Sequence, residues 1–151
     1  MLHIAGNTEG NIHLKMKNLL RGISIFLLFF IGIGAFYGGW SMMTDPTGHS
    51  MHLELFYLQH SPFSTYAIPG LILFITNGLF SLVVALYVSQ SWQPYDKLVL
   101  LQGCVLTGWI VVQVIMLQLI YFLHYIFFCA AVMLIIVGLL LMRFEAKAAH
   151  D

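Results

Sequence analysis

The stretch from Leu98 to Met142 contains no Asp, Glu, Lys or Arg, and residues 22–44 and 55–95 are equally free of charge. A helix needs about 20 apolar residues to cross the roughly 30 Å of hydrocarbon in a bilayer. As one helix, residues 98–142 would measure about 68 Å, so the chain must turn back within them, near residues 118–124. We therefore predict four membrane-spanning helices, over about residues 22–43, 66–89, 98–118 and 125–142.

The composition agrees with this class of protein. The chain is 60% hydrophobic and 8% charged, against roughly 25% charged residues in soluble domains. The expected fold is all-α: a four-helix transmembrane bundle with short loops and one longer outer loop between the first two helices. Residues 16–147 form the single domain, between polar tails at 1–15 and 148–151. The net charge is zero, which excludes a basic face for nucleic acid.

The first span follows a basic flank, as a signal peptide would, but it is too long and has no convincing cleavage site. We expect it to stay in the mature protein. Met16 offers a second start, so residues 1–15 are either a disordered tail or precede the true chain. Asp45-Pro46 predicts the end of the first helix, and Ser61 is a candidate cap for the second.

The positive residues predict the orientation. Cytoplasmic flanks of membrane helices carry an excess of Lys and Arg. With four spans, all six cations fall on one side of the membrane, in the two tails and the second loop: Lys15, Lys17, Arg21, Lys97, Arg143 and Lys147. Both termini are therefore expected in the cytoplasm, and the loop of residues 45–65 is expected outside.

Small and polar residues mark expected helix contacts. Gly34-x-x-x-Gly38 favours close packing inside one bundle, with a homodimer seam as the alternative. Gln102, Trp109 and Gln113 share one helix face, and Asn77 of the second span is placed to meet Gln113. Such amides either bond across helices at about 0.6–2 kcal/mol each or line a ligand site.

The two cysteines, Cys104 and Cys129, lie at depths about 10 Å apart, which is too far for a disulfide. We expect both as small core residues. Catalysis has little support, because the sequence shows no obvious nucleophile with a base partner and no phosphate-binding glycine loop.

The outer loop concentrates metal-binding chemistry in His49, His52, Glu54 and His60. Imidazole and carboxylate groups bind zinc, copper or iron. However, His49-x-x-His52 lacks the spacing and flanking glutamate of a metalloenzyme motif. The alternative is a solvated loop whose apolar side chains dip into the headgroup region.

Three segments carry a family resemblance. They are Tyr37-Gly38-Gly39 with Asp45-Pro46-Thr47-Gly48, Ser61-Pro62-Phe63 with Ile68-Pro69-Gly70, and Gly108-Trp109-Ile110-x-x-Gln113. In this order, over residues 22–142, they resemble a group of small bacterial four-span membrane proteins of uncharacterised function. By size and span count the chain is also distantly similar to DoxX-type proteins, small membrane subunits sometimes tied to quinone or thiol redox chemistry. The resemblance implies the bacterial inner membrane.

These observations predict an outward-facing pocket, because a few polar side chains converge among apolar ones at the outer ends of the spans. Its expected residues are Asp45, Tyr66, Asn77, Trp109, Gln113 and His124. The expected function is a noncatalytic binder of a lipid-like or quinone-like molecule, or an accessory or scaffold subunit. Candidate partners are membrane lipids, another membrane protein or a second copy of the chain. The alternatives are a metal or redox enzyme using the outer histidines, and a small transporter.

Overall fold

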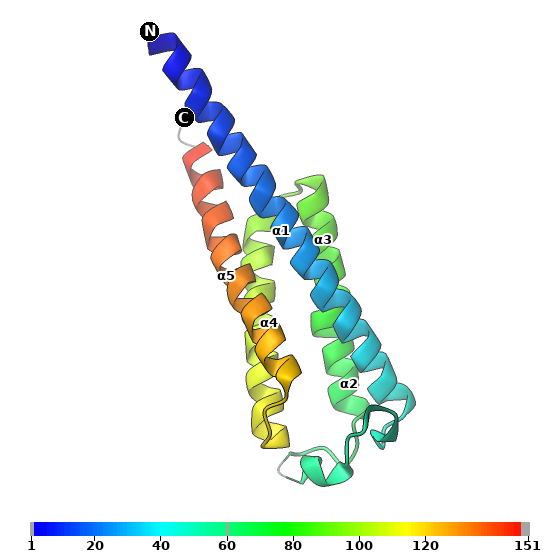
Figure 1. The fold of residues 1–151 in the computed structure, drawn as a ribbon. Coiled ribbons are helices and arrows are strands. Elements are labelled where there is room, and N and C mark those ends of the chain that lie inside the picture. The colour runs from blue at the N-terminus through cyan, green and yellow to red at the C-terminus, as the bar shows by residue number, and fades with distance from the viewer. Residues whose placement is uncertain (1, 60, 149–151) are drawn as a thin grey trace.

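The computed structural model describes residues 2–59 and 61–148, and they form the predicted all-α bundle. Four helices are long and apolar enough to cross a bilayer, which makes the chain a multi-pass membrane protein. The spans cover Asn11–Thr44, Ala67–Gln90, Tyr95–Leu117 and Phe122–Lys147. Figure 1 shows them as one elongated bundle.

The second span differs from the others in its backbone. It consists of α2 (Ala67–Leu73), the π-helical segment η3 (Phe74–Leu79) and α3 (Phe80–Gln90), which follow one another without a break. The remaining helices are α1 (Leu2–Thr44), α4 (Tyr95–Leu117) and α5 (Phe122–Ala148). The first loop contains two short 3-10 helices, η1 (His49–Met51) and η2 (Leu55–Leu58).

The helix ends follow local chemistry. α1 ends directly before Asp45-Pro46, as predicted, because the residue before a proline is driven away from helical geometry. Ser91 and Gln118 adopt left-handed conformations, with φ of 56° and 51°, and close the C-terminal ends of α3 and α4. The predicted reversal after the third span is therefore confirmed, and a left-handed glutamine makes it in place of glycine.

The two ends of the bundle carry different segments (Figure 1). Both chain termini and the turn between α3 and α4 lie at one end, here called the terminal end. The first loop and the turn between α4 and α5 lie at the opposite end, here called the loop end. This arrangement places both tails on the same side of the four spans.

A dense apolar core holds the bundle together. Several of its members are completely buried: Leu28, Ile31, Val84, Val88, Val99 and Leu134. α4 packs along α5, and α1 packs against α2, η3, α3 and α5. α4 contacts α3 but has little contact with α2, so the second and third spans diverge toward the loop end (Figure 1).

Glycines bring α1 and the second span into backbone contact. A Cβ atom on Gly39 would lie 2.7 Å from the carbonyl oxygen of Gly70, and one on Gly78 would lie 3.2 Å from the backbone nitrogen of Phe36. Both distances are too short for a side chain to fit without displacement of backbone. This face of α1 therefore packs inside one bundle, consistent with the role of small residues in membrane helix contacts.

Polar contacts tie the helices together at the terminal end. Arg21 of α1 donates hydrogen bonds to the carbonyl oxygens of Val88 at 2.8 Å and Ser89 at 3.2 Å. These carbonyls belong to the last turn of α3, where intrahelical donors run out; the Val88 oxygen also accepts from the N–H of the cap residue Ser91 at 3.2 Å. A cation is favourable at this negative helix end. Glu145 of α5 pairs with Lys17 at 2.7 Å and accepts a hydrogen bond from the Tyr95 hydroxyl.

The structure corrects three sequence-based expectations. α1 continues through residues 2–15, where the sequence predicts a polar tail, so this segment is a helical extension of the first span. α5 begins at Phe122 and extends to Ala148, beyond the predicted 125–142, and contacts from Glu145 hold its last turns. Cys104 and Cys129 are free, as predicted, but both are exposed on the outside of the bundle and do not belong to the core.

Candidate functional site

A cavity of about 360 Å³ lies at the loop end of the bundle, where α2 and α4 diverge. Its walls come from α1, α2, α4, α5 and both loops of this end, and most of them are apolar. The apolar wall residues include Ile31, Ala35, Met42, Leu53, Leu73, Leu106, Ile110, Leu117 and Phe127. None of the described residues that line it is Asp, Glu, Lys or Arg.

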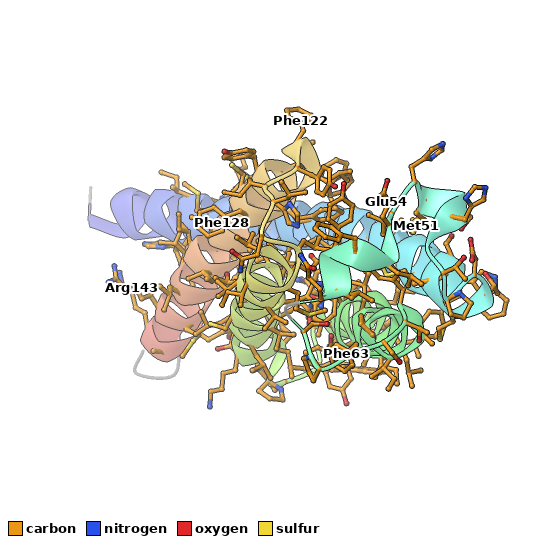
Figure 2. The ribbon with its side chains drawn as sticks, turned by 90° about the horizontal axis from the view of Figure 1, so that it is seen from below. Met51, Glu54, Phe63, Phe122, Phe128 and Arg143 are labelled. Atoms are coloured by element: carbon orange, nitrogen blue, oxygen red, sulfur yellow. The ribbon has the colours of Figure 1, made fainter. Side chains whose placement is uncertain are left out.

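The first loop covers part of this end. Figure 2 views the molecule from the loop end and shows the segment with Met51 and Glu54 lying across the helix ends. Met51, His52 and Leu53 belong to the cavity wall. Tyr66, at the far end of the loop, is almost completely buried, and its hydroxyl donates a 2.8 Å hydrogen bond to the carbonyl oxygen of Glu54.

The cavity brings together three of the predicted site residues. Trp109 and Gln113 lie on α4 and His124 lies at the start of α5, and all three line it. Trp109 and Gln113 are four residues apart, so they occupy adjacent turns of one helix face. Their convergence with His124 follows from the antiparallel packing of α4 and α5 and the tight turn between them.

His124 is held in one orientation by the turn that precedes α5. Its Nδ1 accepts a hydrogen bond from the backbone N–H of Tyr121 at 2.9 Å. An accepting Nδ1 has no proton, so the neutral ring carries its proton on Nε2. The imidazole ring of His124 also stacks on the phenol ring of Tyr121, with centroids 6.0 Å apart and planes inclined at 30°. Only 8% of His124 is exposed, and Nε2 has no hydrogen-bond partner among the described residues.

Trp109 supplies a second polar group without a partner. It is 9% exposed, and its indole Nε1 has no acceptor in the described part of the chain. Buried indole N–H groups ordinarily have a hydrogen-bond partner, and a buried donor without one costs about 1–3 kcal/mol. The indole nitrogen is covered by protein atoms, so an acceptor from outside the chain would reach it only after neighbouring side chains move.

Asn77 does not line the cavity, and its predicted contact with Gln113 is wrong. Asn77 is fully buried in η3 and accepts a 3.4 Å hydrogen bond from the side chain of Gln102. The physical reason is depth: Asn77 lies ten residues from the loop-end start of the second span, whereas Gln113 lies four residues from the loop-end terminus of α4. This is a difference of about 9 Å along the bundle. Asn77 also donates to Thr76 Oγ1 at 3.0 Å, while the Oε1 atom of Gln102 has no partner within the described chain.

Tyr66 and Asp45, also predicted for the pocket, instead organise the first loop. The backbone N–H of Tyr66 donates to the carbonyl oxygen of Pro46 at 2.9 Å, which joins the two ends of the loop. Burial raises the pKa of Tyr66 to about 12, because it disfavours the charged phenolate. This hydroxyl therefore stays protonated and keeps its bond to Glu54.

Asp45 closes a turn directly after α1. Its Oδ1 accepts hydrogen bonds from the hydroxyl of Thr47 at 2.5 Å and the backbone N–H of Thr47 at 3.2 Å, and its Oδ2 accepts from the N–H of Ser50 at 2.7 Å. Hydrogen bonds to the ionised form favour it. The Thr47 hydroxyl, followed by the Ser50 N–H, accordingly lowers the pKa of Asp45 to about 2.

The predicted metal ligands do not form a cluster in the structure. No three His, Cys, Asp or Glu side chains within residues 2–59 and 61–148 lie close enough together to hold one metal ion. His49 and Glu54 are exposed, and His52 is one of the residues that line the cavity. His60 lies outside the described residues. Ser61, the expected cap, stays in the loop and bonds to Leu58 and Phe63.

Sequence reasoning missed most of the cavity wall. Gly34 and Gly38 line it, although their spacing alone indicates helix packing. Leu73 and Phe127 look like ordinary lipid-facing or core residues in the sequence. One signal was available for the glycines: they lie at the same depth as Trp109 and Gln113, where missing side chains leave volume beside polar groups.

No protein-family model matches this chain, and no curated protein or solved structure shows significant similarity to it.

Proposed function

We propose that this protein is a noncatalytic membrane component that binds an apolar, lipid-like or quinone-like molecule in the loop-end cavity. The observation that carries the proposal is the cavity itself. Its volume of about 360 Å³ falls within the roughly 300–1,000 Å³ of typical small-molecule sites. Such sites combine mainly apolar walls with a few convergent polar groups, and here Trp109, Gln113 and His124 supply them.

The proposal includes a location, the bacterial inner membrane with both termini in the cytoplasm. The loop-end segments, residues 45–66 and 118–121, contain no Lys or Arg, which supports an outer position for the cavity. A role as an accessory or scaffold subunit, a DoxX-like relationship, and the redox-enzyme and transporter alternatives stay predictions from the sequence.

A quenching experiment tests whether the cavity binds an apolar molecule. The chain has three tryptophans, and in a Trp40→Phe/Trp92→Phe variant only Trp109 fluoresces. 1-Bromodecane quenches tryptophan on contact, so its binding in the cavity should quench Trp109 with a saturable dependence on concentration. The measurement is made on protein reconstituted in lipid nanodiscs.

Two glycine variants of the same helix separate cavity binding from simple partition into lipid. Gly38 lines the cavity, and its Cβ would lie 3.6 Å from Leu73, so Gly38→Leu fills the space. A Cβ atom on Gly22 would meet nothing within 4 Å, so Gly22→Leu is the matched control. We expect saturable quenching to disappear in Gly38→Leu and to persist in Gly22→Leu. Non-saturable quenching, equal in all three proteins, would refute the proposed function.

A further inference from the structure

The polar groups of the cavity restrict the chemistry of its ligand. We propose that the cavity takes an uncharged amphiphile with a carbonyl oxygen, and that this oxygen accepts a hydrogen bond from His124 Nε2–H. The inference rests on the proposed function and adds the chemical class of the ligand and the residue that recognises it.

His124 presents a free hydrogen-bond donor at the cavity. Its Nδ1 edge is occupied by the Tyr121 N–H at 2.9 Å, so the opposite edge of the ring, with Nε2–H, is the one left for a ligand. The residue lines the cavity and is more than nine-tenths buried. The Nε2 atom itself is not among the fully covered polar atoms without a partner, so a ligand in the cavity can reach it and form a hydrogen bond in place of one with solvent.

Trp109 lies in the α4 wall of the cavity, but its indole nitrogen is covered by protein atoms and does not face a ligand. Gln113, one helical turn away, lines the cavity with an amide that can donate. His124 and Gln113 therefore offer donors to a ligand, and a ligand that carries acceptors complements them.

The lining also excludes a charged headgroup. No Asp, Glu, Lys or Arg is present among its described residues, and an unpaired charge in such a site carries a large desolvation cost. A carbonyl oxygen is a strong acceptor without charge, and it occurs on two kinds of membrane amphiphile, quinones and acyl esters. Both fit the chemistry of the cavity, so the experiment must distinguish them.

Competition against a hydrocarbon probe measures this preference. Tritiated decylbenzene, which has no strong acceptor, is bound to the protein in immobilised nanodiscs, and the counts lost in Gly38→Leu define cavity binding. The competitors are unlabelled decylbenzene, decyl-1,4-benzoquinone, 1-decanoylglycerol, and the ether 1-O-decylglycerol, which lacks the carbonyl. Decyl-1,4-benzoquinone is compared with decylbenzene, and 1-decanoylglycerol with 1-O-decylglycerol. In the wild-type protein we expect the carbonyl member of the recognised class to be about 5–10-fold more potent than its match without a carbonyl.

Two substitutions at His124 locate the donor. His124→Asn keeps an acceptor at the position of Nδ1 for the Tyr121 N–H but has no donor at the position of Nε2. His124→Gln places an amide within reach of the Nε2 position. We expect His124→Asn to remove the 5–10-fold advantage of the carbonyl competitors, and His124→Gln to retain most of it. Each variant is judged by the ratio of potencies of a carbonyl competitor and its match within that variant, and counts sensitive to Gly38→Leu should still be detected in both, which reports that the cavity is present.

The outcomes separate the two proposals. An advantage limited to the benzoquinone assigns a quinone ligand, and one limited to decanoylglycerol assigns an acyl ester; either result supports the inference. Equal potency of carbonyl and matched competitors in the wild-type protein, or an advantage that survives in His124→Asn, overturns it while cavity binding stands. Absence of counts sensitive to Gly38→Leu in the wild-type protein overturns the proposed function itself.

Discussion

At the residue scale, Asp45 shows how one carboxylate orders the start of the first loop. The hydrogen bonds from Thr47 and Ser50 lower its pKa to about 2 from the ordinary 3.8. A lowered pKa means that ionised Asp45 stabilises the folded loop above about pH 3.8 and that this contribution is lost as the pH falls through the lower value. The stability that Asp45 gives to the first loop is therefore lost only at a pH below the usual carboxylate range.

We predict that the amide resonances of Thr47 and Ser50 titrate together with a midpoint near pH 2, followed by NMR of the labelled protein in detergent. In Asp45→Asn this titration should be absent, and the Ser50 amide should lose its acceptor because the Asn Nδ2 cannot accept. A midpoint close to pH 3.8, the ordinary value, would contradict the hydrogen-bonded turn.

The buried pair of Asn77 and Gln102 gives a second prediction at this scale. Asn77→Leu leaves the Gln102 amide without its partner, Gln102→Met does the same to Asn77 Oδ1, and a buried unsatisfied group costs about 1–3 kcal/mol. We expect each of these two single substitutions to destabilise the protein by roughly this amount, measured by unfolding of the protein in mixed micelles. The double variant Asn77→Leu/Gln102→Met removes both polar groups and should recover most of the loss.

A double-mutant cycle on this pair is expected to give a coupling free energy of about 0.5–2 kcal/mol. Single-variant losses that simply add in the double variant would show that the 3.4 Å contact contributes nothing to stability.

At the element scale, the spans were predictable because each boundary has a chemical cause in the sequence. Asp45-Pro46 ends α1, and the length of the charge-free run forces the reversal at Gln118. The inward stripe of Gln102, Trp109 and Gln113 was also predictable, since helical periodicity places them on one face.

The cavity was less predictable because it depends on how the helices lean. Periodicity correctly placed Asn77 and Gln113 on inward faces, but they lie at depths about 9 Å apart, and the divergence of α2 and α4 leaves space beside Gln113. The π-helical segment η3 is another feature without a sequence signal, because it changes the register of one turn and no motif specifies it. Side-chain periodicity thus predicts faces, whereas interhelical angles follow from the whole packing arrangement.

The glycine contact between α1 and the second span predicts which glycine substitutions destabilise the bundle. We expect Gly39→Ala to destabilise the bundle by about 1–3 kcal/mol, because its Cβ would lie 2.7 Å from the Gly70 carbonyl oxygen and 2.8 Å from the Phe74 backbone nitrogen. The same substitution at Gly22, with open space around it, should be neutral or stabilising by up to about 1 kcal/mol. Thermal unfolding of both variants in one detergent checks the difference, and equal stabilities would contradict the close approach of the helices.

At the scale of the whole molecule, the two ends of the bundle have different construction. The terminal end is closed by polar contacts in which Arg21 and Glu145 join α1 to α3, α4 and α5. The loop end is hollow, and its polar side chains line a cavity. A bundle that is tied at one end can leave the other end open to a ligand without losing its overall packing.

The same asymmetry predicts how the bundle is oriented in the membrane. All Lys and Arg residues flank the spans at the terminal end or lie in its tails, and cytoplasmic flanks retain such residues. The loop end should therefore face away from the cytoplasm. Cysteine labelling tests this after Cys104→Ala and Cys129→Ala, which remove two exposed thiols. Gln59 in the first loop and Gln93 in the turn between α3 and α4 are exposed positions for single cysteines.

We expect a membrane-impermeant maleimide to label Gln59→Cys in intact cells and to label Gln93→Cys only after the membrane is permeabilised. The physical reason is that translocating a segment with Lys97 and the neighbouring basic tails is less favourable than translocating the loop of residues 45–66, which has no cation. Labelling of Gln93→Cys alone in intact cells would show that the orientation is the opposite of the predicted one and that the cavity lies on the cytoplasmic side. Its ligand would then have to enter from the inner leaflet, although the cavity and its donors would be unchanged.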